Sequence, residues 1–136
     1  MVEKIVLKGR GIVGGIVEGE ALVVPTHIHT SGLQNGVITE VDHPQRGVSI
    51  KGKVLVFHSP AGSSDWGATL HENWWSGNGP TALINRKATT LVLTGAIASS
   101  IPTVVDLDKD PLEVIETGDW VKVDADHGIV EVFKRH

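Results

Sequence analysis

The sequence predicts an α+β fold, in which a β-barrel-like sheet is flanked by short helices. Two features of its composition support this prediction. Valine and isoleucine are frequent whereas tyrosine is absent, which favours short β-branched strands over a helical bundle. The 16 glycines separate the apolar runs at turn positions. With 136 residues, the chain suits a single domain, residues 1–136, that is long enough to bury a core.

The first half of the chain reads as strands interrupted by glycine. We expect strands at residues 4–7, 20–24, 37–41 and 53–57, and Pro25 is expected to end the second of these because proline lacks a ladder donor. The segment 9–15 has the G-x-G-x-x-G spacing of dinucleotide-binding loops. A strand follows it rather than a helix, so we expect Gly14 and Gly15 to form a bulge or corner of the sheet instead.

The second half alternates helices and strands. A helical segment is predicted at 68–76, a helix or turn of small residues at 90–98, and a helical turn at 111–115, where Pro111 suits the first position. Short buried strands are predicted at 82–84 and 103–105. The segments 120–123 and 129–133 are predicted to form a hairpin across residues 124–128.

The most informative segment is residues 53–67, where an apolar strand ends in Gly62-Ser63-Ser64 and leads into a helix. Such a turn presents unpaired backbone N–H groups that favour an anion, and its glycine lets the backbone approach a ligand closely. The competing interpretation is an ordinary capped loop, with Ser64 or Asp65 as the helix N-cap.

Composition excludes several classes of function. The net charge is −4 and no basic stripe is present, so no nucleic-acid partner is expected. The chain has no cysteine, so it cannot by itself hold a cysteine-ligated iron–sulfur cluster. His27 and His29 share a face of an extended segment, but no third ligand is evident, so no metal site is expected. Without a long apolar run or an apolar segment after the first charges, we expect no membrane partner and a cytoplasmic location.

Several segments, in their order and spacing, match a known family. They are Gly9-Arg10-Gly11-Ile12-Val13, Glu18-Gly19-Glu20-Ala21-Leu22-Val23, His43-Pro44, residues 52–57, Gly62-Ser63-Ser64, Ile84-Asn85, Ile101-Pro102, Thr117-Gly118-Asp119 and Gly128-Ile129-Val130. On these segments the chain resembles the small subunit, or swivelling domain, of the aconitase X group of hydro-lyases. The resemblance implies a swivelling β/β/α architecture and a large-subunit partner that carries an iron–sulfur cluster.

The resemblance also implies a catalytic serine. Ser63 would be the active-site base that abstracts the proton next to the substrate carboxylate. Gly62, Ser64 and Asn85 are the candidate substrate-binding residues, with helix capping by Ser64 and a turn satisfied by Asn85 as the alternatives. A serine is too weak a base at neutral pH unless its alkoxide is stabilised. Backbone N–H groups after Gly62 and an arginine, from the partner or from Arg10 or Arg86, are the candidates for that role.

The resemblance suggests two substrates, both small hydroxy acids. Many relatives carry a basic residue just before the glycine of the turn, where this chain has Ala61. The absence of that charge disfavours a phosphorylated substrate. The expected reaction is therefore dehydration of cis-3-hydroxy-L-proline, with phosphomevalonate as the alternative.

Two alternatives belong to other classes. The segments 101–105 and 118–130 also fit the end of phosphohistidine swivelling domains, in which case His71 would be the phosphoryl carrier. That family requires a Thr-Ser-His-Ala-type motif ahead of a helix, and this chain offers Thr69-Leu70-His71-Glu72. The other alternative is a non-catalytic regulatory subunit, which requires that Trp66, Trp74 and Trp75 be exposed at an interface.

Overall fold

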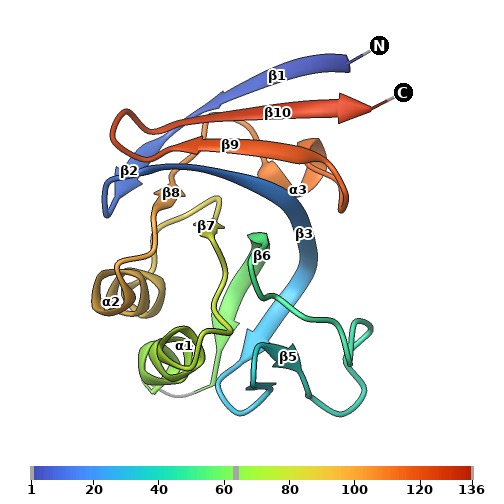
Figure 1. Cartoon of the computed structure of the whole chain (residues 1–136), viewed down its shortest axis with the longest axis vertical. Coiled ribbons are helices and arrows are strands. Elements are labelled where there is room, and N and C mark those ends of the chain that lie inside the picture. Colours follow the sequence, from blue (N-terminus) through green and yellow to red (C-terminus); the bar gives the residue numbers. More distant parts are fainter. Residues whose placement is uncertain (1, 63–64, 136) are drawn as a thin grey trace.

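The computed structural model describes residues 2–62 and 65–135, and within them the strands and helices form an α+β fold (Figure 1). The strands are β1 Val2–Lys8, β2 Arg10–Ile12, β3 Ile16–His29, β4 Leu33–Gln34, β5 Val37–Ile38, β6 Val54–Ala61, β7 Ala82–Ile84, β8 Thr103–Val105, β9 Trp120–Asp124 and β10 Ile129–Arg135. The helices are α1 Trp66–Trp75, α2 Thr90–Ser99 and α3 Pro111–Val114.

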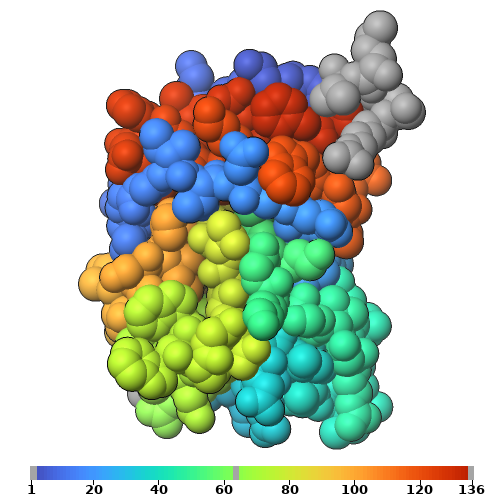
Figure 2. All heavy atoms as spheres, in the orientation of Figure 1, coloured from blue at the N-terminus to red at the C-terminus, as the bar shows by residue number. Residues whose placement is uncertain are grey.

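The main sheet is mixed and closes on itself. Its strand order is β1-β10-β9-β3-β6-β7-β8-β2, in which β3, β6, β7 and β8 run parallel and the other pairs are antiparallel. The two edge strands, β1 and β2, are separated in the chain only by Gly9, so the sheet must curl until its edges meet. This confirms the predicted barrel-like sheet. α1 and α2 pack side by side at one end of the molecule, below the layer of β1, β10 and β9 in Figures 1 and 2.

The glycine-rich segment serves the curvature of the sheet rather than a nucleotide. A Cβ on Gly11 would lie 1.7 Å from the main-chain oxygen of Ala125, and one on Gly9 would lie 2.4 Å from that of Val105. The chain then turns between β2 and β3, where Val13 and Gly15 have φ of +58° and +140°. The expected corner is confirmed at Gly15. The first part of the glycine-rich segment forms the short strand β2, which the sequence pattern did not predict.

Two strands are longer than the sequence predicts, because proline does not end them. β3 continues past Pro25 to His29, and a register shift between Val24 and His27 absorbs the proline. β6 continues through Pro60 to Ala61, while its pairing with β7 stops at Val56. Pro60, which has no N–H to donate, therefore lies beyond the residues of β6 that pair with β7.

The remaining boundaries differ by a few residues. The predicted strand 37–41 is only β5, which pairs with β4, and α1 begins at Trp66 rather than at residue 68. The segment 90–98 is helical, as expected. The side chain of Thr89 caps this helix by accepting from the N–H of Val92.

Two apolar clusters fill the molecule. One lies inside the curled sheet, and the other lies between the sheet and the pair α1 and α2. The second cluster contains Trp66, whose ring stacks on Phe57 with centroids 5.6 Å apart. Trp66 also donates from Nε1 to the oxygen of Ile28 at 3.0 Å. One side chain thus joins α1 to both β3 and β6.

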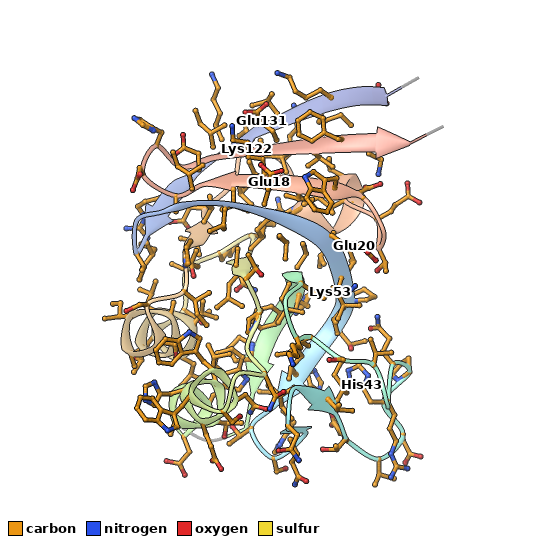
Figure 3. All side chains as sticks on the ribbon, in the orientation of Figure 1. Glu18, Glu20, His43, Lys53, Lys122 and Glu131 are labelled. Atoms are coloured by element: carbon orange, nitrogen blue, oxygen red, sulfur yellow. The ribbon has the colours of Figure 1, made fainter. Side chains whose placement is uncertain are left out.

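The outer face of the sheet carries charges in register. Glu131, Lys122 and Glu18 lie on the adjacent strands β10, β9 and β3, as Figure 3 shows. These residues lie on the part of the sheet farthest from α1 and α2 in that view. The face therefore alternates in charge, and no candidate site residue lies on it.

Candidate functional site

The candidate site residues gather where three parallel strands end. Neighbouring strands β3, β6 and β7 run in the same direction and end at His29, Ala61 and Ile84. The carboxyl edge of parallel strands is the usual position for a ligand in such sheets. Two of the residues predicted to bind substrate lie there, Gly62 directly after β6 and Asn85 directly after β7.

The predicted catalytic residue Ser63 and its neighbour Ser64 lie outside the described residues. The residues on either side define how the chain enters and leaves the turn. Gly62 has φ of +98°, a left-handed conformation that favours glycine, and α1 begins at Trp66 after Asp65. The strand–turn–helix context that the sequence predicts is therefore present.

A histidine and a threonine from β3 and its end lie directly against Gly62. A Cβ built on Gly62 would be 2.9 Å from Thr30 Oγ1, 3.0 Å from His29 Cε1 and 3.1 Å from His29 Nε2. Thr30 donates to the main-chain oxygen of Ala61 from its N–H at 2.9 Å and from its hydroxyl at 3.1 Å. Gly62 is therefore needed both for its φ and for the close approach of His29.

Sequence reasoning missed the position of His29. Because Pro25 is expected to end the strand, the sequence pattern does not place His29 beside β6. The continuation of β3 across the register shift places His29 opposite Ala61. The sequence indicated a longer strand only by residues 26–29, Thr-His-Ile-His, in which polar histidines alternate with an apolar isoleucine, as in a half-buried strand.

Asn85 is buried and makes one defined contact. Its side chain is 1% exposed, and its Nδ2 donates to the main-chain oxygen of Phe57 at 2.8 Å. Its Oδ1 is buried without a hydrogen-bond partner among the described residues. Asn85 thus ties the end of β7 to β6 and retains one unused acceptor.

Two cavities border these strand ends. One, of about 450 Å³, lies between the segment after β3 and helix α1, and its lining is Thr30, Ser31, Leu33, Gln34, Asn35, Thr69, Glu72, Asn73 and Ser76. The other, of about 360 Å³, is lined by Phe57, His58, Ser59, Arg86, Lys87, Thr89, Asp110 and Leu112. Only the second of these two cavities has lysine or arginine in its lining.

The two candidate arginines differ in position. Arg86 follows Asn85, lines the second cavity and pairs with Asp110 across 3.6 Å. Arg10 pairs with Asp106 across 2.8 Å, and it belongs to β2, whose partner strand is β8. Arg86 is therefore the candidate that lies at the end of a strand next to β6.

The two alternatives from other classes find little support. His71 lies in the middle of α1, with its ring 5.5 Å from that of Trp74, whereas a phosphohistidine motif requires a histidine ahead of the helix. The regulatory alternative requires an exposed Trp66, and this condition is not met, because Trp66 is 2% exposed and fills the core beside Phe57. Trp74 and Trp75 are exposed, by 37% and 78%.

The chain offers no set of ligands for an iron–sulfur cluster. It contains no cysteine, and residues 2–62 and 65–135 include no group of three or more His, Cys, Asp or Glu that could hold a metal. The other histidine of the predicted polar segment, His43, is buried and bonds to Thr26, Gln45 and the oxygen of His27. None of the described helices is long and apolar enough to span a membrane.

Comparison with known proteins identifies the family. The model of the aconitase X swivel domain matches residues 6–132. The chain is 39% identical over 131 residues to the phosphomevalonate dehydratase small subunit of Methanosarcina acetivorans, covering 94% of this chain and 91% of that protein. It is 40% identical to the protein of the same name from Thermococcus kodakarensis, covering 94% and 96%. The chain belongs to the aconitase X swivel-domain family, as its motifs predicted.

Solved structures agree with this assignment. The fold matches a chain in the crystal structure of Thermococcus kodakaraensis aconitase X in its holo form with a TM-score of 0.86, at 39% identity and covering 95% of this chain and 98% of that one. It also matches the solution NMR structure of a UPF0107 protein with a TM-score of 0.77, at 34% identity and covering 96% and 100%. The predicted swivelling fold is confirmed.

Proposed function

We propose that the chain is the small, swivelling subunit of a two-chain phosphomevalonate dehydratase, with Ser63 as the base. The observation that carries this proposal is the sequence identity of 36–40% to small subunits of that name along more than nine-tenths of the chain. It favours the second of the two substrates that the resemblance suggested. The whole chain then acts as one unit that carries the serine to a site on the large subunit.

Cationic side chains near the neighbouring strand β7 weaken the charge argument against a phosphorylated substrate. The resemblance implies a basic residue just before the turn, where this chain has Ala61. However, Arg86 and Lys87 follow the end of β7 and line a cavity together with His58 and Ser59 of β6. Guanidinium and ammonium groups are the usual partners of phosphate. These two cations are candidates to replace the charge that Ala61 lacks.

The reaction removes water across two adjacent carbons. The base takes the proton from the carbon next to the carboxylate, the electron pair forms the double bond, and hydroxide leaves from the neighbouring carbon. Ser63 serves as that base only if its alkoxide is stabilised, which is the task of backbone N–H groups after Gly62 and of cationic side chains. Ser64 and Asn85 are the further residues proposed to contact substrate.

The proposal assigns the metal chemistry to the partner. The family implies an iron–sulfur cluster, and a chain without cysteine does not fit one. The large subunit is therefore proposed to hold the cluster, and it would contribute the rest of the site when the two chains close. No step performed by this chain requires a metal ligand of its own.

The proposal is tested by reconstitution. The chain is co-expressed with its large subunit, purified without oxygen, and assayed for loss of water from phosphomevalonate and from cis-3-hydroxy-L-proline. We expect turnover of phosphomevalonate and at least 100-fold lower kcat/KM for the imino acid, since a site built for a charged group rejects substrates that leave it unpaired. Preferential turnover of cis-3-hydroxy-L-proline would contradict the proposed substrate, and a complex inactive on both would contradict the proposed activity.

A further inference from the structure

We propose that His29 is a substrate-binding residue whose Nε2–H donates a hydrogen bond to the carboxylate of the hydroxy acid bound at the Gly62 turn. This inference rests on the proposed function and names a residue that neither the family motifs nor the relatives' names assign. It follows from the position of the ring, from the location of its proton and from the lack of a partner for that proton.

The backbone holds His29 at the turn. β3 and β6 are paired in parallel up to His29 and Ala61, and the next residue, Thr30, donates twice to the oxygen of Ala61. These bonds fix the end of β3 to the residue that precedes Gly62. The imidazole therefore lies on an element of the sheet and not on a free loop.

The ring covers the face of Gly62 that has no side chain. The Cε1 and Nε2 atoms of His29 lie 3.0 and 3.1 Å from the point where a Cβ of Gly62 would be. The Cε1–Nε2 edge of the ring thus lies against Gly62. The other ring nitrogen, Nδ1, faces Ser31.

The hydrogen bonds of Ser31 determine the tautomer of His29. The main-chain N–H of Ser31 lies 3.2 Å from Nδ1 and can only donate, so Nδ1 is the acceptor. The Ser31 hydroxyl lies 3.0 Å from the same nitrogen. In the neutral imidazole the proton must then be on Nε2, which makes this nitrogen a donor that lies beside Gly62.

In the part of the chain that the structure describes, the Nε2–H of His29 has no acceptor. No hydrogen bond among residues 2–62 and 65–135 uses this atom. His43 shows the contrast, since both of its ring nitrogens are engaged, by the N–H of Gln45 on one side and by Thr26 and the oxygen of His27 on the other. An N–H donor beside the proposed anion-binding turn suits a carboxylate oxygen, whereas Arg86 and Lys87 provide the charges that suit a phosphate.

Variants at His29 test this assignment in the reconstituted complex. His29→Leu removes the donor, and His29→Gln keeps an N–H donor at about the position of Nε2. We expect His29→Leu to lower kcat/KM for phosphomevalonate by about 10- to 100-fold, since a hydrogen bond to a charged group is typically worth that much. His29→Gln should retain activity within about threefold of wild type.

Two further measurements separate binding from structure. His27→Leu is the matched control, because His27 is exposed on the same strand and its ring makes no hydrogen bond with a described residue. It should leave kcat/KM, Tm and complex formation unchanged. In the wild-type complex with ¹⁵N-labelled histidine, the Nε2 resonance of His29 should shift when phosphomevalonate is added.

Each other outcome counts against the assignment. Wild-type activity in His29→Leu would overturn it, as would equal losses in the Leu and Gln variants together with a lower Tm, which would mean that the ring only packs. An Nε2 resonance unchanged at saturating substrate would overturn it as well. A wild-type complex without turnover would instead overturn the proposed function, and the role of His29 with it.

Discussion

Asn85 is hydrogen bonded from its side-chain Nδ2 to the main-chain oxygen of Phe57, across 2.8 Å and fully inside the molecule. The bond links the residue directly after β7 to the middle of the neighbouring strand β6, four residues before β6 ends. Asn85 therefore shapes the edge of the sheet at which the candidate site lies. Its Oδ1 is buried and has no hydrogen-bond partner among the described residues, so it is the atom that the proposed contact with substrate would use.

Replacing Asn85 should destabilise the protein. Asn85→Ala removes the donor and leaves the buried oxygen of Phe57 unpaired, which should lower the free energy of unfolding by about 1–3 kcal/mol in urea denaturation. Asn78→Ala is the control, because that amide bonds only to Ser76 within its own turn at the surface. It should change stability by about 0.5 kcal/mol or less. Equal stability of the two variants would mean that the Asn85–Phe57 bond contributes nothing.

Trp66 should be essential for the attachment of α1. Trp66→Ala removes a fully buried ring and should cost about 3–5 kcal/mol. Trp66→Phe keeps most of the volume but leaves the oxygen of Ile28 without its donor, so we expect a loss of about 1–2 kcal/mol. Trp75→Ala should be nearly neutral, since that ring is 78% exposed. Thermal and urea unfolding measure all three, and a neutral Trp66→Ala would contradict the packing described.

Lys134 should make stability fall at high pH. Its ammonium group is buried against Asp119 Oδ2 at 2.6 Å and Glu116 Oε1 at 3.0 Å. Burial lowers the pKa of Lys134, but the hydrogen bonds and charges of Asp119 and Glu116 outweigh it, so the pKa is raised above its ordinary value of 10.5. The stabilisation is therefore complete below about pH 10 and is lost as the pH rises through the raised pKa.

The variant Lys134→Met measures this contribution. It should lose about 3 kcal/mol at neutral pH, because it leaves a buried carboxylate unpaired. Its difference from wild type should shrink above pH 10.5, a range in which no tyrosine or cysteine of this chain can titrate, since it has neither. Lys4→Met, whose ion pair with Glu131 is 53% exposed on the lysine side, should lose less than about 1 kcal/mol. A pH-independent difference would contradict the account.

The glycines of the first segment should not be equivalent. Gly11→Ala forces a Cβ to within 1.7 Å of a main-chain oxygen, so the sheet must shift, and we expect a loss of more than about 3 kcal/mol or no folding. Gly19→Ala on β3 meets neighbours at 3.5 Å or more and should be tolerated. Circular dichroism and Tm of both variants check this. A Gly11→Ala variant as stable as Gly19→Ala would argue against the close contact between Gly11 and the main chain of Ala125.

Local patterns predicted most of the elements, because apolar alternation and glycine turns are short-range signals. The hairpin of β9 and β10, the helix after Gly62 and the corner at Gly15 all follow from them. What they missed depends on tertiary pairing. Proline at residues 25 and 60 reads as a strand end, and only the register shift in β3 and the short reach of β7 explain why both strands continue.

The candidate site was predictable in part for the same reason. The turn at Gly62 and the residue Asn85 stand out by their position after apolar runs. His29 is 33 residues from Gly62 in sequence, and its ring comes to the turn only because β3 lies beside β6. Likewise, the local sequence around Trp66 gives no hint of its stacking on Phe57.

The most direct measurement of the central claim is the turnover of phosphomevalonate by the reconstituted two-chain complex carrying Ser63→Ala, compared with wild type and with Ser100→Ala as an exposed control. The account predicts that Ser63→Ala lowers kcat by at least about 1000-fold, as removal of a catalytic base does, while the complex still forms and KM changes little. A Ser63→Ala complex with kcat within about threefold of wild type would contradict the claim that this chain supplies the base.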